Sequence, residues 1–396
     1  MGGRLRVSAS PRLLSRRRFQ VKRPTLPLYA GGFLGPFGGA MLIALIPNVA
    51  AGLHTSIGRV ALAITAYMIP FASLQLVSGT LAQRIGPARV VRAGYLGFAA
   101  AAVLAALAPE IWTFMAARAL MGASNAFLSP ILLAALSEVV APAVLGRAVG
   151  TFAAWQVAGI TLAPVFGGAL GEVSWRLGFL LVAAVGVAIA LPGATLGPGA
   201  IPRSEHASLR SLANRLIGLL AAKAMLGYLG FTSIGFVVVL VAADEFGLGP
   251  TGRGLLVAGY GVGGFVLGRY AGTVVDRAGR PSTALGGTLA CAAGVLGLAF
   301  TPTAWSMALV YVVIGCGSAF VWAALNTIAV ESFPENRAGA TSAYSAFKFA
   351  GVAIAPLVYV PLFHVDTRAP FLLAAGFSAL LAVLILPWFG RYREAG

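Results

Sequence analysis

The feature that most constrains this chain is a series of long apolar segments that no charged residue interrupts. Residues 181–194, with the sequence LVAAVGVAIALPGA, are one example. A helix needs about 20 predominantly apolar residues to cross a bilayer, whereas a spanning strand needs about ten residues of alternating polarity. Continuous apolar runs therefore predict membrane-spanning helices and argue against a transmembrane barrel.

Composition supports lipid as the solvent for most of the chain. Hydrophobic residues occupy 59% of the 396 positions and charged residues only 10%, whereas a soluble domain carries about 25% charged residues. The length allows twelve spans with short connections. We predict an all-α fold with helices over 27–50, 59–82, 89–108, 111–138, 147–170, 176–197, 215–243, 252–275, 283–302, 305–330, 338–362 and 369–390.

The net charge of +17 follows the pattern of membrane orientation and not of a nucleic-acid-binding surface. With the N-terminus inside, 20 of the 28 Lys and Arg residues fall in cytoplasmic segments and only four in outer loops, as the positive-inside rule requires. We expect a multi-pass protein of the plasma (inner) membrane with both termini cytoplasmic and no nucleic-acid partner. The predicted parts are a basic tail over 1–25 that can touch anionic lipid, a six-helix bundle over 26–197, a cytoplasmic linker over 198–214, a second bundle over 215–390 and a cytoplasmic C-terminus over 391–396.

The two predicted bundles are repeats of one another. GTLAQRIG at 79–86 matches GTVVDRAG at 272–279, an offset of 193, and Tyr67 meets Tyr260 at the same offset. Six spans return a chain to the side on which it started, so the repeats must be parallel. Two parallel six-helix halves are a known transporter plan, with the substrate site between them near the bilayer midplane.

The loop over 79–89, GTLAQRIGPAR, resembles the loop between helices 2 and 3 of the major facilitator superfamily. In that family the loop latches the cytoplasmic side of the carrier by charge pairing, and here Gln83 replaces the usual Asp. We expect Gly79 to let helices approach and Gly86 to permit a tight turn. The predicted latch residues are Gly79, Arg84, Gly86, Arg89 and Glu138 in the first half, and Gly272, Asp276, Arg277, Gly279 and Glu331 in the second.

The fifth predicted helix, GTFAAWQVAGITLAPVFGGAL, resembles the antiporter signature of the same family, which accompanies proton-coupled efflux. Ala163 stands where the signature has Gly. Proline kinks a helix and small residues let a neighbour pack closely, so simple helix packing is the alternative interpretation. The matching residues are Gly150, Gly159, Pro164, Gly167 and Gly168.

All four charges predicted inside helices are cations, and no acid accompanies them in a helix interior. Lys223 and Arg269 lie near helix ends, where their side chains can reach the membrane surface. Arg118 and Lys348 lie deeper and are predicted to line a central cavity that favours anionic or electron-rich substrates. Arg118 also fits a short helix-4 motif of the family that is tied to proton coupling. A second hypothesis makes Lys348 the proton carrier, because lysine loses its proton more readily than arginine.

Neutral polar residues complete the predicted cavity set, with helix-to-helix hydrogen bonding as the alternative role for each. They are Asn48, Gln75, Asn125, Gln156 and Asn326.

The expected function is secondary transport of a small molecule by alternating access, as proton-coupled efflux. Uptake or exchange of a small anion is the alternative, and a sensor or lipid-handling role stays open. No catalytic set, nucleotide-binding loop or metal-ligand cluster is recognisable, so we expect no enzyme activity, cofactor or metal site. Protons, lipid and a small-molecule substrate are the expected partners of a monomer.

Overall fold

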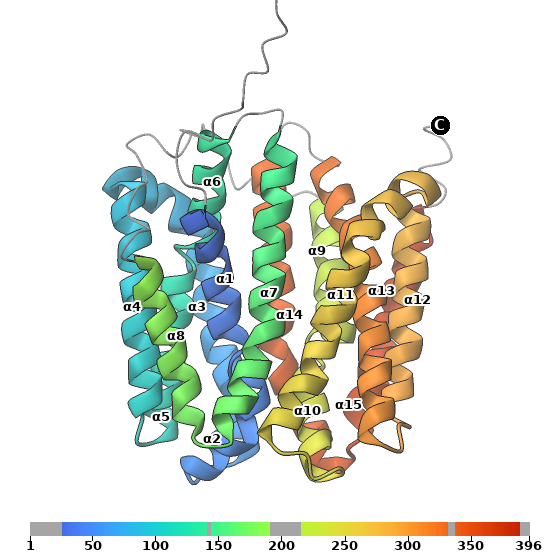
Figure 1. Cartoon of the computed structure of the whole chain (residues 1–396). Coiled ribbons are helices and arrows are strands. Elements are labelled where there is room, and N and C mark those ends of the chain that lie inside the picture. Colours follow the sequence, from blue (N-terminus) through green and yellow to red (C-terminus); the bar gives the residue numbers. More distant parts are fainter. Residues whose placement is uncertain (1–25, 141–143, 191–214, 332–336, 389–396) are drawn as a thin grey trace, which may run out of the picture.

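The computed structural model describes residues 26–140, 144–190, 215–331 and 337–388 (Figure 1). These residues are helical and contain no strand. The predicted tail over 1–25, the linker over 198–214 and the C-terminus over 391–396 lie outside the described ranges.

The first half is built from helices of which two are interrupted near the middle of the bundle. The first predicted span is divided into α1, the short 3-10 helix η1 and α2, and the fourth into α5 and α6. The elements are α1 (Leu26–Ala40), η1 (Ile43–Leu45), α2 (Ile46–Gly52), α3 (Ile57–Ile85), α4 (Pro87–Leu107), α5 (Ile111–Asn125), α6 (Ser129–Val139), α7 (Leu145–Gly171) and α8 (Trp175–Ala190).

The second half repeats this order, and its first span is interrupted by a π-helical turn, η4. The elements are α9 (Arg215–Gly227), η4 (Tyr228–Thr232), α10 (Gly235–Asp244), α11 (Pro250–Ala278), α12 (Arg280–Leu298), α13 (Ala304–Glu331), α14 (Arg337–Val365) and α15 (Ala369–Ile385).

The observed helices occupy the twelve predicted spans. Across the described ranges, nine helical segments are long and apolar enough to cross a membrane, and α8 and α15 are shorter apolar helices. The remaining span is α11, which has 29 residues. The prediction of an all-helical membrane fold is therefore confirmed.

The internal repeat is visible in the packing of each half. In the first half α3 and α4 pack on α5, α1 on α7 and α4 on α8; in the second half α11 and α12 pack on α13, α9 on α14 and α12 on α15. The correspondence extends to one close helix crossing. A Cβ added at Gly122 would collide with the backbone carbonyl of Tyr67, and one at Gly315 would collide with that of Tyr260.

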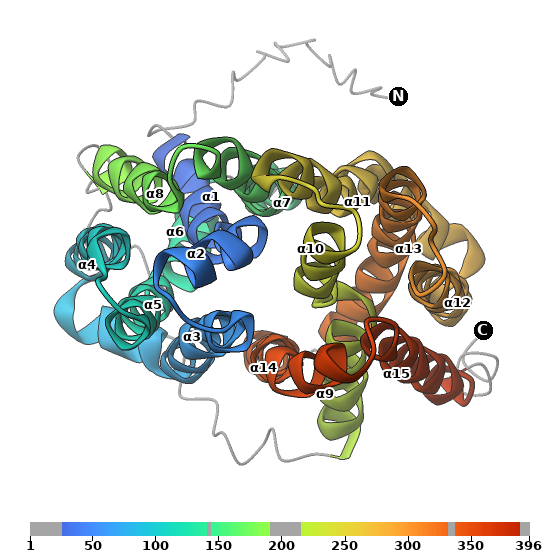
Figure 2. The same ribbon diagram turned by 90° about the horizontal axis from the view of Figure 1, so that it is seen from below.

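The halves meet along two seams, α7 against α11 and α3 against α14, which Figure 2 shows on opposite edges of the molecule. We use two names for the ends of the bundle. The tail end carries the start of α1 and the turns at Gly86 and Gly279, and is uppermost in Figure 1. The far end carries α2, α10 and the connection between α7 and α8.

Candidate functional site

Arg118 lies in α5 at the point where α1 ends. Its side chain is fully buried, with 0% of its surface exposed. The guanidinium donates from Nη1 to the Gly38 carbonyl at 2.9 Å and from Nη2 to the Gly39 carbonyl at 3.0 Å. The last carbonyls of a helix have no partner within it and carry partial negative charge. Arg118 therefore serves as a buried cap on the C-terminal end of α1.

The aromatic ring of Tyr67 supports this cap. The guanidinium carbon of Arg118 lies 4.5 Å from the ring centroid of Tyr67, within the range of a cation–π interaction. The Tyr67 hydroxyl donates to the Gly35 carbonyl at 3.2 Å, and Asn125 packs directly against Gly35. In this conformation Arg118 and Asn125 are therefore buried in the core of the first half, and their predicted role in a cavity or in proton coupling stays a prediction.

Lys348 in α14 has different surroundings. Its side chain is half-buried, and its Nζ lies 5.6, 5.4 and 5.3 Å from the ring centroids of Tyr228, Trp322 and Tyr344. Among the described residues, no hydrogen-bond acceptor or acid contacts this ammonium group. Of the two deep cations, only Lys348 is therefore available to a solute.

The other two cations differ from each other as well. Arg269 is exposed and donates to the Tyr270 hydroxyl at 2.7 Å, as expected for a side chain near a membrane surface. Lys223 is only 3% exposed, and its Nζ lies 3.2 Å from the ring centroid of Trp388. The prediction that Lys223 reaches out of the membrane is wrong, because this ring holds the ammonium inside the bundle.

The neutral polar candidates do not form one cluster. Asn48 lies at the far end, where its amide accepts a hydrogen bond from Arg253 of the other half, so it does not belong to a midplane cavity. Gln156 is half-buried and donates to Ser129 Oγ at 3.5 Å. Gln75 is half-buried, and Asn326 is exposed.

The helix-5 motif lies on the faces of α7 that contact neighbouring helices. Gly159 approaches the backbone of α1 at Phe33, and Gly167 approaches Met41. Gly168 packs on the Pro250 carbonyl of α11, and the Pro164 carbonyl is packed in turn by Gly254. Gly150, at the start of α7, has no atom within 4 Å of where its Cβ would lie.

Specific polar and aromatic contacts reinforce the two seams. Thr65 in α3 donates to the Ala353 carbonyl of α14 at 2.6 Å. Phe71 meets Phe349 edge to face with ring centroids 4.7 Å apart. At the α7–α11 seam the Thr251 amide donates to Glu172 Oε1 at 3.0 Å. This bond holds the pKa of the Glu172 carboxyl below its ordinary value.

The latch residues at the tail end show no comparable contact between halves among the described side chains. No atom lies within 4 Å of a Cβ added at Gly79 or Gly272, so the expectation that Gly79 brings helices together does not hold in this conformation. Gly86 and Gly279 have φ of +106° and +83°, values that favour glycine and form the α3–α4 and α11–α12 turns.

Among the described residues at the tail end, Arg280 and Glu331 form an ion pair that lies within the second half. Arg280 donates from Nη2 to Glu331 Oε1 at 2.6 Å and from Nε to Oε2 at 3.0 Å. This bidentate pair joins α12 to α13. Arg84, Arg89, Asp276 and Arg277 are exposed, and the side chain of Glu138 lies outside the described residues.

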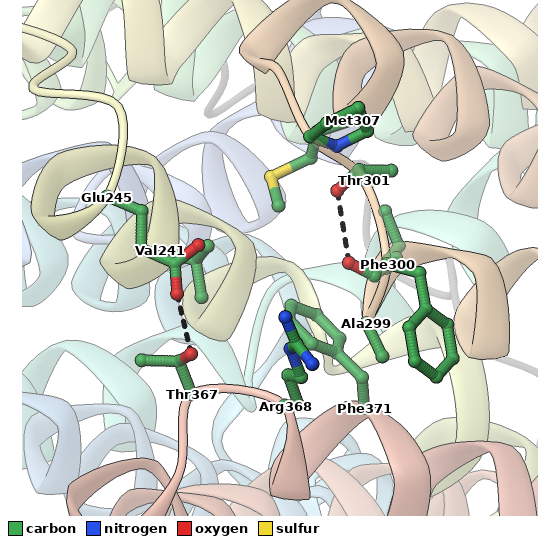
Figure 3. Close-up of a pocket in the computed structure, with 11 residues that line it drawn as sticks. Val241, Glu245, Ala299, Phe300, Thr301, Met307, Thr367, Arg368 and Phe371 are labelled. Carbon is green, nitrogen blue, oxygen red and sulfur yellow. Dashed lines mark hydrogen bonds between the residues drawn. The ribbon is translucent and has the colours of Figure 1, made fainter.

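Two small cavities lie among the described residues away from Lys348. One, of about 250 Å³, lies between α3 and α14 and is lined by Thr65, Met68 and Leu357 among others. The other, of about 160 Å³, lies at the far end of the second half (Figure 3). There Glu245 accepts a hydrogen bond from Thr367 at 2.5 Å, and Arg368 lies beside Phe371. None of these residues is predicted from the sequence to be part of a site.

The rings around Lys348 belong to no motif of the sequence. Trp322 lies in an apolar segment, where a tryptophan can line a cavity or pack in the core, and neither Tyr228 nor Tyr344 is part of a motif. The internal repeat could have pointed to Tyr228. It lies 193 residues after Gly35, the residue whose carbonyl accepts the hydrogen bond of the Tyr67 hydroxyl.

Two parallel six-helix repeats, apolar along their spans and without a catalytic constellation in the described residues, define a secondary membrane transporter. The comparisons place it more closely: residues 28–223 and 220–395 match the Major Facilitator Superfamily, and the chain belongs to that family.

Relatives of known name support this assignment. The multidrug efflux protein YfmO of Bacillus subtilis (strain 168) is 27% identical over 374 residues, which cover 91% of each chain. The multidrug efflux pump LfrA of Mycolicibacterium smegmatis is 34% identical over 167 residues, which cover 42% of this chain and only 32% of LfrA. A crystal structure of the nucleoside transporter NupG superposes with a TM-score of 0.78 at 14% identity, covering 92% of this chain and 99% of that one, which shows a shared fold.

Proposed function

We propose that this chain exports a small organic molecule from the cell in exchange for protons, by alternating access. The observation that carries the proposal is the contrast between the two ends of the bundle. The Asn48–Arg253 and Glu172–Thr251 contacts join the halves at the far end, while Gly79 and Gly272 face open space at the tail end. The halves are therefore joined at the far end, and we infer an opening between them at the tail end.

The direction of transport is inferred from α7. Of its antiporter-like motif, Gly168 and Pro164 pack on α11, at the seam that must open when the passage changes sides. Two relatives carry efflux in their names. With the tail end cytoplasmic, the observed conformation is the one that would take up solute from the cytoplasm of a plasma (inner) membrane.

Proton exchange is assigned to Lys348. The described helix interiors contain no acid, and Arg118 is held by the carbonyls of α1. Lysine can gain and lose a proton, whereas arginine stays charged. Of the two lysines in the described helices we choose Lys348, because its neighbour Phe349 packs across the α3–α14 seam on Phe71, whereas Lys223 packs on Trp388 within the second half. Lys348→Met should therefore abolish solute-driven proton movement, whereas Arg269→Met, which removes an exposed cation beside a ring, should not.

The test uses everted membrane vesicles and a pH-sensitive dye. A growth screen of an overexpressing strain against toxic anions, cations and neutral drugs first supplies the solute. Addition of that solute outside everted vesicles should make the lumen more alkaline, because protons leave as solute enters. No pH change in wild-type vesicles that accumulate the solute would refute proton exchange.

Uptake or exchange of a small anion is the second candidate, and Lys348 favours it because the ammonium has no acid partner among the described residues. A proton–anion symporter running backwards in the same vesicles would acidify the lumen. The sign of the pH change therefore separates the two functions.

A further inference from the structure

We propose that Lys348, Tyr228 and Tyr344 form an anion-binding site walled by Trp322, and that its occupant is a planar aromatic monoanion such as an aryl carboxylate. This inference rests on the second candidate function, transport of a small anion, and names the substrate class, because an anion held by the protonated Lys348 binds together with the proton. It is carried by a hydrogen-bond donor that lacks an acceptor and by the rings that surround Lys348.

One buried donor in this region has no acceptor among the described residues: the Tyr344 hydroxyl. The Tyr344 ring lies 5.3 Å from the Lys348 Nζ. The described contacts of the Lys348 ammonium are with the rings of Tyr228, Trp322 and Tyr344. Ring faces attract an ammonium group but do not satisfy its N–H donors as oxygen atoms do. A buried donor without an acceptor costs free energy, and a carboxylate supplies several acceptor positions at once.

The walls are suited to a flat ring. Trp322 lies 4.8 Å from Tyr228 and 5.6 Å from Phe231, centroid to centroid. Phe349 lies 6.5 Å from Tyr228 and is held by Phe71 of the other half. The indole is thus fixed in orientation, and aromatic surfaces at this spacing favour offset or edge-to-face contact with an aromatic ligand.

The charge of the ligand follows from the charges around the site. Lys348 is the cation among these rings, whereas Lys223 packs against Trp388 and Arg118 donates to the Gly38 and Gly39 carbonyls of α1. One ammonium in a medium of low polarity compensates one negative charge and leaves a second uncompensated. Binding of a cationic ligand is disfavoured because the ammonium of Lys348 already lies among the rings of Tyr228, Trp322 and Tyr344.

The test is binding to the purified full-length protein in detergent, measured by titration calorimetry with three probes of similar shape. Benzoate should bind, benzyl alcohol should bind at least about tenfold more weakly, and benzyltrimethylammonium should not compete. Lys348→Met should weaken benzoate binding at least about tenfold, and Tyr344→Phe, which removes only the unpartnered hydroxyl, should weaken it several-fold. Arg269→Met is the matched control and should bind benzoate as the wild type does.

Two results would overturn the inference: benzyltrimethylammonium binding more tightly than benzoate, or full benzoate affinity in a folded Lys348→Met protein with unchanged helical circular dichroism. Binding needs no proton gradient, so the outcomes are separable from those of the proposed function. Benzoate binding without proton movement in vesicles would remove proton exchange and keep the site. Proton exchange driven by other solutes, with no benzoate binding, would remove the site and keep the function.

Discussion

At the scale of single residues, Arg118 and Lys348 show how two deep cations can have opposite roles. The sequence places both inside helices without an acid nearby, and it predicts the same cavity-lining role for each. The structure separates them because α1 ends beside Arg118, where backbone carbonyls lack partners. That break cannot be read from the apolar run over 27–50, so the sequence alone could not distinguish a capping arginine from a ligand-binding one.

Arg118→Met should lower the stability of the protein substantially. The change removes two charge-assisted hydrogen bonds, each contributing about 1.5–3 kcal/mol, and leaves buried carbonyls unsatisfied. We expect a loss of about 3 kcal/mol or more, seen as a lower thermal unfolding temperature in detergent. Arg118→Lys should recover part of the loss, because one ammonium cannot reproduce the fork of the guanidinium.

The exposed Arg269 provides the control for this prediction. Arg269→Met should shift stability by no more than about 0.5 kcal/mol, as is usual for surface positions. An Arg118→Met protein as stable as the Arg269→Met protein would show that Arg118 does not cap α1.

At the scale of elements, the seam between α7 and α11 depends on glycines, which let the two helix backbones approach closely. Gly168 and Gly254 each pack on a backbone carbonyl of the opposite helix, whereas Gly268, further along α11, faces open space. The motif in α7 predicts close packing, and the sequence identifies the right glycines. It could not indicate α11 as the partner, because the spacing of small residues carries no information about which helix lies against them.

Gly254→Val should separate the halves at the far end, since a side chain there would collide with the Pro164 carbonyl. Spin labels at Val173 and Val365, which are 82% and 83% exposed, would report the change in a background where Cys291 and Cys316 are alanine. The distance distribution should move to longer values in Gly254→Val and stay unchanged in Gly268→Val. Equal distributions in both variants would show that the seam does not depend on this glycine.

The Glu172–Thr251 contact makes a pH-dependent contribution to the same seam. A carboxylate at the N-terminal turn of α11 is favoured by the free amides there, and the bond lowers the pKa of Glu172. A carboxyl with a lowered pKa stabilises the fold above its ordinary pKa of about 4.3, and that contribution disappears as the pH falls through the lowered value.

Glu172→Ala should therefore be less stable than wild type at pH 7, and the difference should vanish in strong acid. Thermal unfolding at a series of pH values measures it. Glu110, an exposed acid whose side chain caps no helix, is the control, and Glu110→Ala should show no such trend. A Glu172→Ala difference that persists in acid would mean that the carboxylate charge is not what strengthens the contact.

At the scale of the whole molecule, most of the fold could be predicted. Lipid-spanning helices must satisfy their backbone internally, so long apolar runs define the spans, and the offset of 193 residues reveals the repeat. The interruptions at η1, η4 and the α5–α6 junction were not predicted. They occur within apolar sequence and depend on tertiary partners, such as the Tyr359 hydroxyl on the Leu229 carbonyl.

The proposed orientation predicts which end of the bundle faces the cytoplasm. A membrane-impermeant maleimide should label a single cysteine at Val173 in intact cells, and one at Arg89 only after permeabilisation. Both positions are exposed, at the far end and the tail end respectively, and the cysteine-free background again serves as the control. Labelling in the reverse order would place the tail end outside and contradict the positive-inside assignment.

The edge-to-face pair of Phe71 and Phe349 lies near the middle of the α3–α14 seam. If the halves rotate as rigid bodies, they turn about a contact in this position. Distances measured there would stay nearly constant while those at the two ends change in opposite directions. Phe71 also contacts Tyr67, and Phe349 contacts Tyr228. Replacing Phe71 or Phe349 by alanine would therefore weaken the contact about which the halves turn, without changing the contacts at the two ends of the bundle.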